Sequence, residues 1–318
     1  FHPEQISLEQ SSRSRSARRV RLRLRQMQPI VLATPRWSCP QSFLEDLALE
    51  LAIAEPTILC RTVSFRAMKG RPRNEVWRLV LSAMAQLSAA RWTETQVPYV
   101  ASTVGFRRTA IELLLKAQDE NQGQVALLAH GAEWVPKEVI QALSDAWGLY
   151  EQKVPTGRKA TLLLAGSSGA RHLRLGEAPT LTLEDFGPLE ATQAFYSQFR
   201  ETPPDQLDSA VHFSGGIPAV IDALSAGMRR LGGVPHSTSG LLRCLGDLQH
   251  EIRGAVDIAS SDPELAGRIE ALCEEELPYH PETDDRLGLA GLIHRLRRPG
   301  GDQVGLRAPL LGALLSGV

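Results

Sequence analysis

The sequence predicts an α/β fold, with a parallel sheet in its first half and mainly helices in its second. Two observations lead to this prediction. Short, almost uninterrupted apolar runs recur between residues 29 and 186, and segments with helical spacing separate them. Such runs are typical of parallel strands buried on both faces by helices. With 318 residues, of which 43% are hydrophobic, the chain is long enough for two or three compact units.

Strands are predicted where apolar and β-branched residues cluster over a few positions. The first run, PIVLAT, opens the pattern, and the later runs QVALLA and ATLLLA are equally apolar. The predicted strands are residues 29–34, 57–65, 124–129 and 160–165, with a short fifth strand at 181–183.

Helices are predicted between these strands. In residues 40–54 the apolar side chains of Phe43, Leu44, Leu47 and Leu51 repeat with the spacing of one helical face, and Pro40 suits a first helical turn. The other helices predicted in this half are residues 74–90, 106–117 and 136–150.

After Phe186 the strand signal stops and helical segments follow one another. A helix, a Pro-Gly-Gly turn at residues 299–301 and a short strand at 303–307 then resemble the end of a winged-helix unit, a variant of the helix-turn-helix. Gly232 and Gly233 are a predicted joint. The predicted helices are residues 188–200, 204–213, 217–231, 239–256, 263–276, 283–297 and 308–315.

Residues 1–28 differ in composition from the rest of the chain. Arginines accumulate there, and the alternation from Val20 to Arg25 has the two-residue period of a half-exposed strand. One interpretation is a solvated or flexible arm that packs a few leucines. The other is contact with phosphates or with an acidic partner. The candidate contact residues are Arg13, Arg15, Arg18, Arg19, Arg21 and Arg23.

Composition excludes several classes of protein. The formal charge of −1 and the pI of 6.8 argue against a globally basic nucleic-acid binder, although a local basic patch stays open. Four widely spaced cysteines without a CxxC pair predict neither a common zinc site nor a disulfide scaffold, and they suit a reducing cytoplasm. No apolar run approaches the roughly 20 residues that span a bilayer. The chain starts at Phe1, which is compatible with a piece of a longer polypeptide.

The first predicted strand and helix are joined as in a phosphate-binding loop, G-x-x-x-x-G-K-[ST]. In the register set by the strand and by Phe43 and Leu44, the loop motif runs from Thr34 to Gln41. The chain then lacks both glycines, the lysine and the hydroxyl that would hold Mg²⁺. Loss of the lysine charge alone removes on the order of 4 kcal/mol of phosphate attraction at an effective dielectric of about 20.

The third predicted strand lacks the acidic pair that would hold Mg²⁺ and orient water. His130 and Gly131 stand in its place, and Glu133 follows two residues later with a predicted surface role. His130 is predicted to be structural, because no nucleophile or second acid lies near it in sequence. The positions of this degenerate nucleotide site are Thr34, Arg36, Ser38, Cys39, Pro40, Gln41, His130, Gly131 and Ser167.

In spite of these losses the order of segments resembles the STAND/AAA+ class of P-loop ATPases, in particular its prokaryotic archaeal-type and origin-recognition-like branch. The segment LLLAGSS at residues 162–168 resembles a sensor-1 strand, and LTLEDFGPL at 181–189 resembles the link to a helical lid. The segment SGGIP at 214–218 resembles the start of the lid helix that precedes sensor 2. LAGLI at 289–293 and VGLRAPLL at 304–311 resemble the winged-helix ending.

The resemblance spans residues 29–318 and implies four segments. They are a basic arm or linker at 1–28, a degenerate P-loop core at 29–186, a helical lid at 187–232 and a winged-helix domain at 233–318. In the last domain Arg295, Arg297 and Arg298 are candidate nucleic-acid or partner contacts, or else simply complement the dipole of a helix C-terminus.

The first functional hypothesis is a pseudo-ATPase without cofactor, metal or catalytic residue. It would act as a scaffold or regulatory subunit that binds proteins in a larger assembly, away from membranes. The alternative is a nucleic-acid-binding module of a defence, replication or transposition-type system. A third hypothesis is an ATPase whose missing groups come from another subunit.

Overall fold

The computed structural model of the chain describes residues 12–88, 100, 102–167, 172–235, 237–298 and 301–315. Its contacts divide the chain into two compact units. The sheet unit comprises Ser16–Thr34 and Pro40–Leu183. The C-terminal unit comprises Glu184–Val318 together with residues 12–15 and Pro35–Cys39. The short segment between the first strand and its helix therefore belongs by its contacts to the C-terminal unit.

A five-stranded parallel sheet forms the centre of the sheet unit, with the order β2-β3-β4-β1-β5. This confirms the predicted α/β class and all five predicted strands. In register, Thr34 at the end of β1 pairs with Ser167 at the end of β4, and His130 at the end of β3 pairs with Ala165. The strands are β1 Ile30–Thr34, β2 Ile58–Ser64, β3 Gln124–His130, β4 Ala160–Ser167 and β5 Thr180–Thr182.

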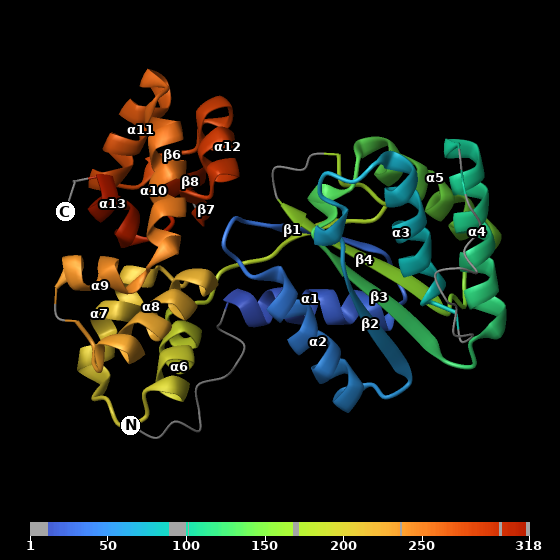
Figure 1. Cartoon of the computed structure of the whole chain (residues 1–318), viewed down its shortest axis with the longest axis horizontal. Helices are drawn as coiled ribbons and strands as arrows, with labels where there is room; N and C mark the ends of the chain where they lie inside the picture. Colours follow the sequence, from blue (N-terminus) through green and yellow to red (C-terminus); the bar gives the residue numbers. More distant parts are fainter. Residues whose placement is uncertain are drawn as a thin grey trace. The chain divides into compact units, whose positions relative to one another are not determined.

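Helices cover both faces of this sheet (Figure 1). Along β3, Val125, Leu127 and Ala129 face one cluster of buried residues, whereas Ala126 and Leu128 face the other. That alternation, with both sets buried, explains why residues 125–129 contain no polar side chain. The first face carries α3 Arg73–Ala85, α4 Thr103–Glu120 and α5 Lys137–Lys153; the second carries α1 Ser12–Arg25 and α2 Pro40–Ala54; single 3₁₀ turns are η3 Arg66–Met68 and η5 Ala132–Trp134.

Helix α1 replaces the strand predicted at residues 20–25, and that prediction is wrong. Val20 and Leu24, four residues apart, lie on one helical face and are fully buried against α2 and the sheet, whereas Leu22 is 56% exposed. An alternating segment of six residues contains an i, i+4 pair as well as a two-residue period. Burial in the core decided between the two periods, so residues 16–25 are not a flexible arm.

The C-terminal unit is mainly helical and ends in a small antiparallel sheet of order β6-β8-β7. One continuous cluster of buried residues runs through it, from Phe195 on α6 to Leu311 on α13. Its elements are α6 Pro188–Gln198, α7 Pro204–Ser214, α8 Pro218–Leu231, α9 Thr238–Cys244, α10 Asp247–Ser260, α11 Pro263–Glu274, β6 Leu277–Pro278, α12 Pro281–Ala290, β7 Ile293–Arg298, β8 Gly301–Leu306 and α13 Pro309–Leu315.

Two predicted helices in this unit are wrong in extent. The helix predicted over residues 239–256 is broken into α9 and α10 at Gly246, which has a φ of 57°. The helix predicted over 283–297 ends at Ala290, because Gly291 adopts the left-handed conformation that terminates helices. The basic residues after it form strand β7, which pairs with β8. Arg295, Arg297 and Arg298 therefore lie on a strand and do not cap a helix.

Within the described part of the chain, no helix combines the length and the apolar character needed to cross a bilayer.

Candidate functional site

The carboxyl ends of β3, β4 and β1 lie next to one another at one edge of the parallel sheet. Open α/β sheets bind ligands beyond this edge, where connections leave neighbouring strands in different directions. Thr34, His130 and Ser167 are the last residues of β1, β3 and β4. The sheet thus brings together three of the positions, Thr34, His130 and Ser167, that the sequence assigned to the degenerate nucleotide site.

The β1–α2 loop, residues Pro35–Cys39, has a backbone conformation that is unusual for residues other than glycine. Trp37 and Cys39 both have positive φ, of 64° and 48°. This left-handed conformation costs a non-glycine residue roughly 1–2 kcal/mol, which is why glycine usually occupies it. The sequence register predicts Cys39 at the position of the second glycine of a phosphate-binding loop. The backbone there adopts a glycine-like conformation although the residue is not glycine.

Four consecutive carbonyl oxygens of this loop accept hydrogen bonds from the C-terminal unit. Arg307 Nη1 donates to the carbonyl of Arg36, and the backbone N–H of Ala219 in the first turn of α8 donates to that of Trp37 at 3.1 Å. Arg13 donates to the carbonyl oxygens of Ser38 and Cys39, at 2.9 and 3.3 Å. Two arginines and a helix N-terminus therefore hold the loop.

The side chains of the site do not form an anion cradle. Thr34 is 5% exposed, and Ser38 is fully buried with no hydrogen-bond partner for its hydroxyl among the described residues. Gln41, at the position of the Mg²⁺-binding hydroxyl, instead donates to Glu45 one turn further along α2, at 2.9 Å. The exposed Arg36 guanidinium lies 5.4 Å from the Trp37 ring centroid.

Cys39 is a free, partly buried cysteine of the loop. Burial raises its pKa above the ordinary value, the carboxylate of Asp222 acts in the same direction, and the Arg13 guanidinium opposes both. Because the thiolate is the reactive form, a raised pKa keeps the thiol protonated and poorly nucleophilic at neutral pH.

The end of β3 is built around Gly131 and Glu133. Gly131 has a φ of 76°, and a Cβ there would come within 3.1 Å of the Arg66 backbone nitrogen. Glu133 Oε2 accepts from the backbone N–H of Ser167 at 3.2 Å. A Cβ on Gly166 would meet this carboxylate at 3.1 Å, so glycine permits the approach. The sequence missed this contact, because it joins residues 34 positions apart.

His130 is half-buried beside several charges. Burial lowers its pKa below the ordinary value, and the cation of Arg66 also lowers it, whereas Glu45 and Glu133 raise it. The lowered pKa favours the uncharged form of the ring at neutral pH. Its backbone carbonyl accepts from Phe65 N–H at 2.8 Å, which ties the end of β3 to the end of β2.

These residues do not fit a magnesium nucleotide. A phosphate needs several backbone N–H donors and a cation, and Mg²⁺ needs carboxylate or hydroxyl oxygens. At these positions the chain offers Pro40 in place of lysine and His130 and Gly131 in place of acids. The Glu133 carboxylate is engaged with the Ser167 amide. Among the described residues, no group of three or more His, Cys, Asp or Glu could hold a metal ion.

The arginines of the N-terminal segment mostly contact the chain itself. Arg13 is only 7% exposed and binds the loop. Arg23 donates to Gln28 at 2.7 Å. Arg18 and Arg19 point to the exposed side of α1. Ion pairs join Arg15 to Glu184 at 3.9 Å, Arg21 to Glu50 at 3.1 Å and Arg25 to Glu55 at 2.5 Å.

The candidate contacts near the C-terminus lie on strand β7. Arg295 pairs with Asp302 on β8 and also stacks on Tyr279, with its guanidinium carbon 3.8 Å from the ring centroid. Arg297 and Arg298 pair by their backbones with Asp302 and Gly301, and their side chains lie outside the described part. Arg295 is therefore already engaged with its own unit.

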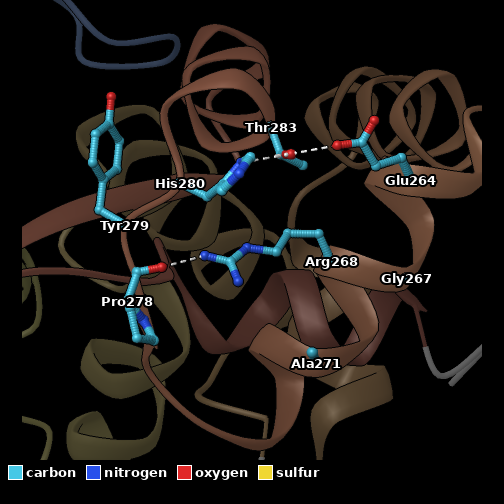
Figure 2. A pocket seen from close by; sticks show the side chains of 8 residues that line it. All are labelled: Glu264, Gly267, Arg268, Ala271, Pro278, Tyr279, His280 and Thr283. Carbon is cyan, nitrogen blue, oxygen red and sulfur yellow. Dashed lines mark hydrogen bonds between the residues drawn. The ribbon is translucent and has the colours of Figure 1, made fainter.

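A shallow groove of about 570 Å³ lies between α11, β6 and α12 (Figure 2). The Thr283 hydroxyl donates to Glu264 at 2.7 Å and lies 3.3 Å from His280 Nδ1. Arg268 donates to the Pro278 carbonyl at 2.5 Å and forms a bidentate pair with the buried Asp284. Because the hydroxyl proton of Thr283 goes to a carboxylate, His280 does not activate it. The groove is a structural junction.

Comparisons with known proteins identify the fold. No protein-family model matches the chain, and no curated protein matches it either. A solved Walker-type ATPase of Pyrococcus abyssi is similar, with a TM-score of 0.59 and 14% identity over 96% of this chain and 95% of that chain. Cdc6p of Pyrobaculum aerophilum matches with a TM-score of 0.50 and 9% identity, over 100% of this chain and 96% of its own.

At these identities the similarity concerns the fold alone. It extends over almost the whole of both chains and includes the sheet unit and the C-terminal unit. The parallel sheet, the helices on its two faces and the helical second half together give this chain the fold of the P-loop ATPases.

Proposed function

We propose that the chain is a pseudo-ATPase, a P-loop ATPase fold that neither binds nor hydrolyses ATP and acts as a scaffold or regulatory subunit by binding other proteins. The observation that carries the proposal is the β1–α2 loop. It lacks the glycines, lysine and hydroxyl of a phosphate-binding loop, and four of its carbonyl oxygens are bound by the protein itself.

The end of β3 gives independent support. In an active site of this kind, acidic residues hold the metal and orient the attacking water. Here the strand ends in His130, and neither it nor the following Gly131 carries a carboxylate. If the fold is retained without the groups for its chemistry, the best explanation is that its surfaces bind other proteins.

Titration calorimetry tests the first half of the proposal. We expect no Mg²⁺-dependent binding of ATP at concentrations up to about 1 mM, which corresponds to less than about 4 kcal/mol of binding free energy. Micromolar binding would disprove the proposal. A matched variant with Thr34→Gly, Cys39→Gly, Pro40→Lys and Gln41→Thr restores the motif in the register given above and should gain measurable affinity.

The nucleic-acid alternative has less support from the charges. Residues 247–318 contain thirteen acidic and seven basic residues, a formal charge of −6. In the first turn of α12, Glu282 is an exposed acidic residue, whereas Asp284 is buried in its pair with Arg268. The winged helix of this alternative would present α12 to DNA, and the Glu282 carboxylate there would repel phosphates.

Fluorescence anisotropy with duplex DNA decides this alternative. A phosphate-binding surface on α1 would give an affinity that falls with salt by a slope of about −0.9 per phosphate neutralised. It would also weaken when Arg18 and Arg19 are both replaced by Ala. We expect neither effect.

The third hypothesis, an ATPase completed by another subunit, requires turnover in the presence of that subunit, because an arginine finger can be donated in trans.

A further inference from the structure

Two arginines from distant parts of the chain, Arg13 and Arg307, hold the β1–α2 loop within the C-terminal unit. Arg307, 3% exposed, comes from the segment between β8 and α13. It forms a bidentate pair with Asp185, at 2.6 Å for each bond, and directs Nη1 to the carbonyl of Arg36. Bidentate pairs fix the guanidinium plane. The atom that reaches the loop is therefore positioned by the pair with Asp185.

Arg13 is positioned just as firmly, although it comes from the other end of the described chain. Its backbone N–H and that of Ser14 donate to the Glu190 carboxylate, at 3.2 and 2.9 Å. Its guanidinium carbon lies 4.9 Å from the ring centroid of Phe186. From there Nη1 and Nη2 reach two successive loop carbonyls, those of Ser38 and Cys39.

The loop needs this support, because its own sequence does not favour its conformation. Trp37 and Cys39 have positive φ without being glycine. The end of α12 also comes close: a Cβ on Gly291 would lie 2.7 Å from Arg36 Cβ and 3.2 Å from the Trp37 ring. A chain held in a disfavoured conformation relaxes when its restraints are removed.

We propose that Arg13 and Arg307 form a latch that holds the β1–α2 loop in one conformation, and that removing either arginine opens the loop. The latch depends on the chain's own contacts, so it stands whether or not the chain is a pseudo-ATPase. Because its two members lie near opposite ends of the described chain, a partner protein that engages either end has a route to the loop.

Hydrogen exchange of the full chain, followed by mass spectrometry, tests the latch. Arg13→Ala removes the hydrogen bonds that the guanidinium donates to the carbonyls of Ser38 and Cys39. The peptide that contains residues 35–39 should then exchange about tenfold faster, the factor that corresponds to about 1.4 kcal/mol. Arg19→Ala, an exposed arginine on the same helix, is the matched control and should leave this peptide unchanged.

The second arm uses conservative variants, which protect the test against misfolding. Arg13→Lys and Arg307→Lys keep the charge but lose the fork that bridges two acceptors. Both should also accelerate exchange in residues 35–39. If the loop exchanges at the control rate in Arg13→Ala, or in both lysine variants, the latch does not exist.

Labelling of Cys39 with a maleimide separates opening of the loop from a purely electrostatic effect. The Arg13 cation lowers the pKa of Cys39, so its removal from an unchanged loop would raise that pKa and slow the labelling. An opened loop would expose the thiol and label faster. Faster labelling of the Cys39 peptide in Arg13→Ala supports the latch, and slower or unchanged labelling overturns it.

Discussion

The turn after β3 and the loop after β1 both contain residues with positive φ, but different features stabilise this backbone conformation in each. After β3, Gly131 adopts a φ of 76° at no side-chain cost. After β1, Trp37 and Cys39 adopt φ of 64° and 48° with side chains attached, and two arginines hold the loop carbonyls. The turn after β3 needs no distant contact for its positive φ, because glycine adopts it freely. The conformation of the β1–α2 loop, in contrast, is stabilised by Arg13 and Arg307, which lie 25 and 271 positions from the loop residues they bind.

The largest loss of stability is expected for the loop after β1, because the buried charge of Arg307 holds it. Arg307→Ala leaves Asp185 without its partner and the loop without a donor. Breaking a buried pair costs about 3–5 kcal/mol, measurable by chemical denaturation. Arg286→Ala removes a half-exposed pair with Asp262 and should cost less than about 1 kcal/mol. Equal losses in the two variants would contradict the role assigned to Arg307.

Exchanging the residue types of the two turns should have opposite effects. Gly131→Ala places a Cβ at positive φ close to the Arg66 backbone and should lower the free energy of unfolding by about 1–2 kcal/mol. Cys39→Gly removes strain and should raise it by up to about 1 kcal/mol. Thermal unfolding of both variants beside the wild type checks the signs. A loss in both would show that the Cys39 side chain stabilises the loop.

The smallest effect concerns the pH dependence of stability at His130. Its pKa in the folded protein is lowered, chiefly by burial, so the unfolded chain takes up a proton at higher pH than the folded one. The stabilising contribution is therefore complete above the ordinary pKa of about 6.5 and is lost as pH falls through the folded value. Between about pH 7.5 and 5 the wild type should lose more stability than His130→Gln; parallel curves would contradict this sign.

The helix at residues 12–25 and the ending after α12 show where local pattern failed. In the segment from Val20 to Arg25, apolar residues fit a helix and a strand equally well, and only burial of Val20 and Leu24 against α2 selected the helix. After α12, Gly291 was a visible stop signal, yet the apolar residues on either side of it continued a helical spacing. Pairing with β8, a contact between separate segments, made the following residues a strand.

At the candidate site, too, some features could be predicted from the sequence and others could not. The missing glycines, lysine and acidic pair could be seen in the sequence, because each is a residue type at a fixed spacing from a strand. The contact of Glu133 with the Ser167 amide and the contacts of Arg13 and Arg307 with the loop could not. No spacing rule connects residues that meet only because of the fold.

The sequence by itself determined the parallel sheet and its five strands, and it predicts a phosphate-binding loop that has lost its motif, since apolar runs and residue types are local properties. Only the tertiary structure decided what holds the β1–α2 loop. Its conformation is disfavoured locally, and the hydrogen-bond donors that stabilise it come from both ends of the described chain.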